Sequence, residues 1–149
     1  MSSFSNGPRP AWAWIGALAV ALSACSSANA TDATASFAAT PFDVLTSAGG
    51  LHVEARSAPE AQPARGVNSV ELAVSDPTGA PRDGLGVDVV PWMSAMGHGA
   101  SVKPSARAVG GGRYVLSDVD FFMPGRWELR ITFTSGAADD HATLVIPIS

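Results

Sequence analysis

The segment Pro-Trp-Met-Ser-Ala-Met-Gly-His-Gly at residues 91–99 holds the side chains best suited to chemistry. Met93, Met96 and His98 fall within six residues, and the glycines on either side of His98 let the backbone turn so that imidazole and sulfur converge. Thioether sulfur is a soft ligand, and together with imidazole it selects Cu(I) over harder ions. Trp92 offers an aromatic face beside a soft cation. The spacing predicts a copper site with Met93, Met96 and His98 as ligands.

A packing role is the alternative for the same residues. Methionine commonly fills gaps in hydrophobic cores, so Trp92 and Met93 would then cap one end of a domain while the glycines form a tight turn. Two or three thioethers in a sequence do not separate a metal site from a packed end. Taken alone, the cluster therefore favours the packing role, and the copper site stays open beside it.

The remaining candidates for chemistry are weaker, and we expect a protein without catalytic activity. No G-x-S-x-G nucleophile elbow occurs, and Ser94 has no orienting acid in its own loop. Asp118 and Asp120 lack a calcium-binding loop, which favours solvated carboxylates. The three glycines at 110–112 precede a strand pattern rather than a helix, so they do not form a phosphate cradle.

Short alternating segments must position the Met/His loop. In the clearest one, Trp127, Leu129, Ile131 and Phe133 alternate with polar residues. We expect strands over 51–56, 70–75, 87–90, 100–108 (the weakest), 113–119, 127–134 and 142–148. About seven strands at this spacing predict an all-β fold, an immunoglobulin-like antiparallel β-sandwich over 41–149, with Trp127 in its core.

The order of these strands predicts which loops meet. If each connection reverses the chain, the loop after 87–90 and the loop after 113–119 lie at the same end of the sandwich. The second loop contains Met123, which could then approach the Met/His loop as a further metal ligand, whereas His141 falls at the opposite end and His52 is remote. This depends on the 100–108 strand. Without it the ends reverse and His141 becomes the better partner.

The first 24 residues are typical of a lipoprotein signal peptide. A polar start is followed by an apolar run from 11 to 22, which is too short to span a hydrocarbon core of roughly 30 Å as a mature helix. Leu22-Ser23-Ala24-Cys25 then resembles the bacterial lipobox, and we expect Cys25, the single cysteine, to be diacylated. Residues 25–40 are small and polar and predict a flexible tether.

The charge balance limits the class of partner. The chain has 13 acidic and 9 basic side chains and no basic cluster, which argues against nucleic-acid binding. The expected contacts are a membrane, through the lipid, and an extracytoplasmic protein partner. The domain should lie in the cell envelope, on the outer or inner membrane. Ser26, rather than Asp, after the cysteine favours the outer membrane by resemblance to the enteric sorting rule.

Three segments together resemble the YtkA/FixH-like domain family over roughly residues 42–148. They are Trp-Met-x-x-Met-Gly-His-Gly at 92–99, Gly-Gly-Arg-Tyr at 111–114 and Phe-Phe-Met-Pro-Gly-Arg-Trp-Glu-Leu at 121–129. The resemblance implies an extracytoplasmic β-sandwich, often tethered to a membrane, in which Met93, Met96, His98, Met123 and Trp127 match the family pattern.

The function that the resemblance implies differs between branches of the family. FixH-like members are associated with copper handling during assembly of haem-copper oxidases, whereas many lipoprotein members have no established activity. FixH-like proteins are anchored by a transmembrane helix and this chain by lipid on Cys25, which argues against an oxidase-assembly role. We therefore expect a lipoprotein that binds or delivers copper, with an envelope interaction module as the alternative.

Overall fold

The computed structural model describes residues 36–149. The predicted signal peptide, Cys25 and most of the predicted tether lie outside the described residues. The described residues form nine strands: β1 (Asp43–Thr46), β2 (His52–Ala58), β3 (Gly66–Ser75), β4 (Gly86–Met93), β5 (His98–Gly99), β6 (Ser105–Gly110), β7 (Arg113–Phe121), β8 (Gly125–Ser135) and β9 (Ala138–Ile148). In this part of the chain no helix is long and apolar enough to cross a membrane.

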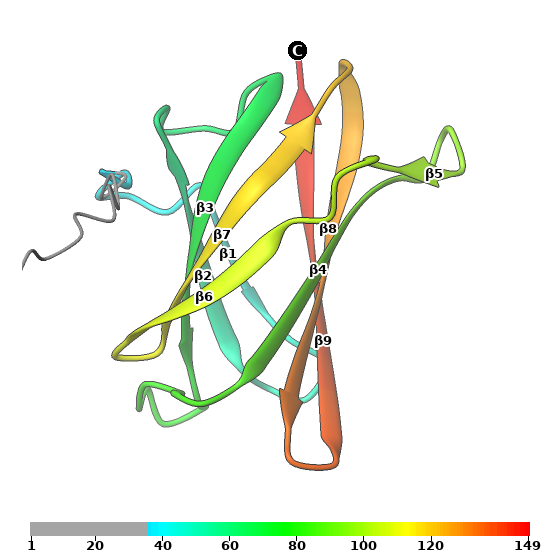
Figure 1. The fold of residues 1–149 in the computed structure, drawn as a ribbon. Coiled ribbons are helices and arrows are strands. Elements are labelled where there is room, and N and C mark those ends of the chain that lie inside the picture. Colours follow the sequence, from blue (N-terminus) through cyan, green and yellow to red (C-terminus); the bar gives the residue numbers. More distant parts are fainter. Residues whose placement is uncertain (1–35) are drawn as a thin grey trace, which may run out of the picture. The chain divides into compact units, whose positions relative to one another are not determined.

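The strands form two antiparallel sheets that pack as a sandwich (Figure 1). One sheet has the order β1-β2-β3-β7-β6, and the other has the order β5-β4-β8-β9. The predicted β-sandwich is confirmed, with nine strands in place of about seven. β1 and β5 were not predicted because they have four and two residues, too few to show an alternating pattern.

The alternation in β8 produces the centre of the core. Trp127, Leu129, Ile131 and Phe133 are each at most 1% exposed, and Val70 and Leu72 of β3 are fully buried in the same cluster. Successive side chains of a strand point to opposite faces, so β8 presents its polar residues on the outside of the sheet. The expected core position of Trp127 is confirmed.

The weakest predicted strand is displaced rather than missing. It was expected at 100–108, and the structure has β6 at Ser105–Gly110, paired with β7 in register Ser105↔Ser117. The shift follows from Pro104, which is buried directly before β6 and has no N–H to contribute to a ladder. The chain still reverses between β6 and β7, so the condition for the predicted meeting of loops is met.

Asp140 fastens the two sheets together at the end of the sandwich where β8 turns into β9. Its carboxylate accepts hydrogen bonds from Ser47 Oγ and from the Gly49 N–H at 2.5 Å. The Ala48 N–H donates to the His141 carbonyl at 2.9 Å. The turn between β1 and β2 is thus held against β9 of the opposite sheet.

Candidate functional site

The predicted Met/His loop is a β-hairpin at the end of β4. The chain leaves β4 at Met93, turns through residues 94–97 and returns as β5, in which His98 pairs with Met93. The N–H groups of Met96 and Gly97 both donate to the Met93 carbonyl, at 3.1 and 3.0 Å. Gly97 has φ 70°, a left-handed conformation that glycine adopts without steric cost. Gly97 therefore permits the turn, as the sequence indicated, whereas Gly99 lies in β5, where a Cβ would come within 2.7 Å of the Pro91 carbonyl oxygen.

The loop between β7 and β8 lies beside this hairpin. The His98 imidazole stacks on the Phe122 ring, with centroids 5.9 Å apart and an interplanar angle of 18°. Met123 follows Phe122 directly and packs partly buried against the core. The prediction that these two loops share an end of the sandwich is confirmed. Figure 1 shows the hairpin that carries β5 projecting from the sandwich near the end where β7 leads into β8.

The other two histidines lie elsewhere, as expected. His141 Nδ1 is 3.3 Å from Thr132 Oγ1. Thr132 lies four residues further along β8 than Glu128, the residue that pairs with Trp92 beside the hairpin. His52 Nδ1 is 3.3 Å from Thr46 Oγ1 in the β1–β2 pair. Neither imidazole is part of the hairpin end.

The three methionines differ in their access to solvent. Met96 is 57% exposed on the turn, Met93 is 3% exposed within the core cluster, and Met123 is partly buried. The Met93 side chain also lies against Gly125, because a Cβ placed on that glycine would meet Met93 Cε at 3.0 Å. Met93 therefore has the surroundings of a packing residue, and Met96 those of an accessible thioether.

The surroundings of His98 suit a metal ligand. Its Nδ1 is 3.3 Å from the Gly99 carbonyl oxygen, which favours the tautomer that carries the proton on Nδ1 and leaves the Nε2 lone pair for a ligand. A ligating histidine usually has its other ring nitrogen held in this way. The exposed position of His98 on a hairpin leaves Nε2 within reach of solutes.

An aromatic cluster connects His98 to the core. Phe122 meets Trp127 edge-on, with ring centroids 5.2 Å apart at 78°, and Trp127 Nε1 donates to the Met123 carbonyl at 3.0 Å. The buried indole thus fixes the backbone of the loop that carries Met123. Trp127 supports the candidate site from below and has no exposed surface of its own.

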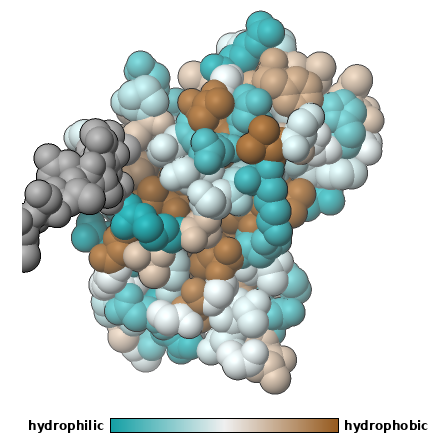
Figure 2. Space-filling model, in the orientation of Figure 1, coloured by the Kyte–Doolittle hydropathy of each residue, from teal (hydrophilic) through white to brown (hydrophobic). Residues whose placement is uncertain are grey.

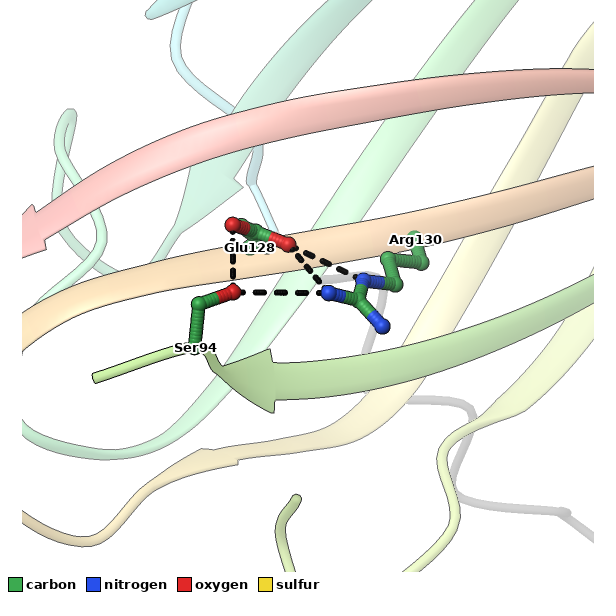
Figure 3. A network of polar contacts seen from close by, with 3 residues as sticks. All are labelled: Ser94, Glu128 and Arg130. Carbon is green, nitrogen blue, oxygen red and sulfur yellow. Dashed lines mark hydrogen bonds and ion pairs between the residues drawn. The ribbon is translucent and has the colours of Figure 1, made fainter. Parts of the chain in front are cut away.

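A polar network on the outer face of β4 and β8 was missed by the sequence reasoning (Figure 3). Ser94 Oγ donates to Glu128 Oε1 at 2.6 Å, and Arg130 donates to Glu128 Oε2 through Nη2 at 2.7 Å and Nε at 2.9 Å. The Arg130 guanidinium also lies over the Trp92 ring, 5.0 Å from its centroid. The hydrogen bond from Ser94 and then those from Arg130 lower the pKa of Glu128 below its ordinary value.

A signal for this network was present in the sequence. Glu128 and Arg130 are two residues apart on the polar face of the clearest strand, so their side chains had to be neighbours. The contribution of Ser94 could not be foreseen, because it depends on the register between β4 and β8.

The donors at this end favour a soft ion. Among residues 36–149, no group of three His, Cys, Asp or Glu side chains is arranged to hold a metal ion. Asp118 and Asp120 therefore join no such group. Thioether and imidazole groups, present here in Met96, Met123 and His98, are donor types that suit a soft ion such as Cu(I). The burial of Met93 places its side chain on the core side of the same hairpin.

The surface has no single large apolar patch on the face in Figure 2, where hydrophobic residues are interspersed with neutral and hydrophilic ones. At the hairpin end, Met96 and Phe122 are nevertheless exposed, Phe122 by 37%. The hairpin end thus exposes two large apolar side chains, one of which, Phe122, stacks on His98.

The comparisons with known proteins place the chain in a family. A family model described as YtkA-like matches residues 47–132, a range that contains the β4–β5 hairpin, the β7–β8 loop and Trp127. No curated protein and no solved structure matches the chain significantly.

Proposed function

The chain belongs to the YtkA-like family, and from this premise we propose that it is a non-enzymatic extracytoplasmic protein that binds or delivers Cu(I). The ion is the cargo, and the hairpin end of the β-sandwich is its site. Family membership supports an extracytoplasmic β-domain protein. The copper assignment is drawn from the side chains at that end.

The meeting of two loops is the observation that carries this proposal. His98 of the β4–β5 hairpin stacks on Phe122, and the next residue along the chain is Met123. Imidazole and thioether donors from segments about 25 residues apart in the sequence are thereby brought to one end of the domain. Exposed Met96 adds a second thioether on the hairpin itself.

The residues would divide the work by their exposure. Met96 and His98 are open to solvent and would take the ion first, whereas Met123 is held in place through the hydrogen bond from Trp127 to its carbonyl. Trp92 lies under Arg130, so its ring face is already covered by a cation. It would therefore support the hairpin rather than face the ion.

The anchor forms the second part of the proposal. We assign diacylation to Cys25, which would hold the domain at the outer or inner membrane, since acyl chains contribute about 0.8 kcal/mol per buried CH₂. A Cys25→Ser variant should move from the membrane fraction to the soluble envelope fraction, and mass spectrometry should find no lipid on its N-terminal peptide. Retention of the variant in the membrane would contradict the anchor.

Thermal unfolding with and without Cu(I) tests the site. A ligand that binds only the folded state stabilises it, by about 2.7 kcal/mol when the free ligand concentration is 100 times Kd. This stabilisation raises the unfolding temperature. The variant Met93→Leu/Met96→Leu/His98→Asn should lose this shift while its metal-free stability falls little. A large loss of metal-free stability with the copper shift retained would mean that these residues serve packing.

The second candidate is an envelope interaction module. The exposure of Met96 and Phe122 at the hairpin end favours it, because apolar side chains on a projecting turn are suited to contact another protein. Under this alternative the metal-free domain would crosslink to an envelope protein through a cysteine introduced at Met96, and the crosslink would be insensitive to copper chelators.

A further inference from the structure

The hairpin that carries Met96 and His98 has few contacts of its own. β5 has two residues, with the register pairs Trp92↔Gly99 and Met93↔His98, and it forms the edge of its sheet. The backbone bonds of the turn converge on one acceptor, the Met93 carbonyl. A ribbon this short is marginal in water, so its conformation depends on what else holds the turn.

Besides the stacking of His98 on Phe122, Ser94 links this turn to the rest of the domain. It is the first residue after β4, and its hydroxyl donates to Glu128 at 2.6 Å and lies 3.4 Å from Arg130 Nη2. Glu128 pairs with Trp92 in the β4–β8 register. Its carboxylate therefore projects from β8, a long strand that is paired with β4. Figure 3 shows the three side chains pointing toward one another across these strands.

The network is organised around the carboxylate. Arg130 makes two hydrogen bonds to Glu128 Oε2, which leaves Oε1 free to accept from Ser94. The Trp92 ring also contacts the guanidinium, which lies over it. Each of the three polar side chains therefore has a partner within the network, and the carboxylate gives the serine hydroxyl a charged acceptor.

We propose that Glu128 is a positioning residue for the hairpin: with Arg130 it fixes Ser94 and so keeps Met96 and His98 at the end of the sandwich where Met123 lies. The copper consequence of this inference rests on the proposed function, whereas its effect on the turn does not. Exposed ion pairs contribute little to global stability. The network should therefore act on the order of the turn and leave the stability of the whole domain nearly unchanged.

The test compares native-state hydrogen exchange in the metal-free proteins. In Glu128→Gln and Ser94→Ala, the Met96 and Gly97 amides should exchange several-fold faster, while the Ile131 amide in the core of β8 keeps its rate. Ser94→Thr, which retains a hydroxyl, should restore slow exchange. Glu54→Gln is the matched control, because Glu54 pairs with Arg56 two residues along β2 at 2.6 Å but holds no turn.

Three results would overturn the positioning role: unchanged Met96 and Gly97 exchange in Glu128→Gln, equal acceleration of all amides, or the same acceleration in Glu54→Gln. The Cu(I) dissociation constant gives the second readout, and it should rise in Glu128→Gln and stay constant in Glu54→Gln. If the wild-type protein binds no Cu(I), the proposed function fails while exchange still decides the positioning role. If copper binds and exchange is unaffected, only the positioning role fails.

Discussion

Exposure distinguishes the residues that share the Met/His hairpin. Met96 and Met93 are three positions apart, yet one is 57% exposed and the other 3%. His98 lies between solvent and the Phe122 ring. The same thioether chemistry therefore serves two purposes within one hairpin: Met93 fills the end of the core, and Met96 offers a soft donor to solution.

Single leucine substitutions should separate these purposes. Met96→Leu should weaken Cu(I) binding at least about tenfold, the loss seen even for partners outside the ligand shell, and change the unfolding free energy by less than about 0.5 kcal/mol. Met93→Leu conserves volume, so it should cost less than about 1.5 kcal/mol and leave the affinity nearly unchanged. Competition titration and chemical denaturation measure the two quantities. Equal loss of affinity in both variants would make Met93 a ligand.

Two glycines with positive φ lie where the β4–β5 hairpin and the β7–β8 loop come together. Gly97 has φ 70° with open space around its Cβ position, and Gly125 has φ 139° with Met93 Cε 3.0 Å from that position. Any other residue at either position would strain the backbone, but only at Gly125 would the added Cβ also displace a packed neighbour, Met93.

Alanine at these two glycines gives a matched pair. Gly97→Ala should destabilise the domain by about 1 kcal/mol through backbone strain alone. Gly125→Ala should cost more, by about a further 1 kcal/mol, because the added methyl group would also press on Met93 Cε, which must shift within a filled core. Chemical denaturation of both variants checks this order. A smaller cost at Gly125 would show that Met93 moves freely, contrary to a packing role.

The elements that sequence reasoning predicted correctly are those with long alternating patterns. β8 and β3 were readable because large apolar residues return at every second position, from Trp127 to Phe133 in β8 and from Val70 to Val74 in β3. β1, β5 and the start of β6 were not, because their extent depends on pairing with β2, β4 and β7 rather than on their own residues.

The site was predictable to a similar degree. The turn at 94–97 and the shared end with Met123 followed from glycine spacing and strand order. The burial of Met93 and the link from Ser94 to Glu128 did not, since both depend on the inward or outward phase of β4 and on its register with β8. A one-residue shift of that register would exchange the faces of Trp92 and Met93.

At the scale of the whole molecule, the hydrogen bonds of Asp140 to Ser47 and Gly49 join the two sheets. They lie at the end of β8 away from the candidate site, where Asp140 pairs with Phe133. Burial raises the pKa of the Asp140 carboxyl. The hydrogen bonds from Ser47 and from the backbone N–H groups of Gly49 and His141 lower this pKa by more than burial raises it, so the net pKa lies below the ordinary value of 3.8. The folded protein thus binds this proton less readily than the unfolded chain does. Its contribution to stability is complete above about pH 4 and is lost as pH falls through the lower, folded pKa.

Removing the carboxylate should therefore make the unfolding free energy depend less on pH in the acid range. Asp140→Asn should destabilise the domain by roughly 1–3 kcal/mol at neutral pH, the range for a lost charge-assisted hydrogen-bond set, and the difference from wild type should shrink as pH drops below about 4. Urea denaturation from pH 2 to 7 gives the comparison. A difference independent of pH would contradict a role for the ionised carboxylate.

The most direct test of the central claim is a Cu(I) competition titration of the soluble domain, residues 26–149, against a chromophoric chelator under reducing conditions. We expect one ion per chain, bound tightly by the wild-type domain and lost in a variant that combines Met96→Leu with His98→Asn. Absence of binding by the wild-type domain, or binding that survives in that variant, would contradict a copper site at the hairpin end.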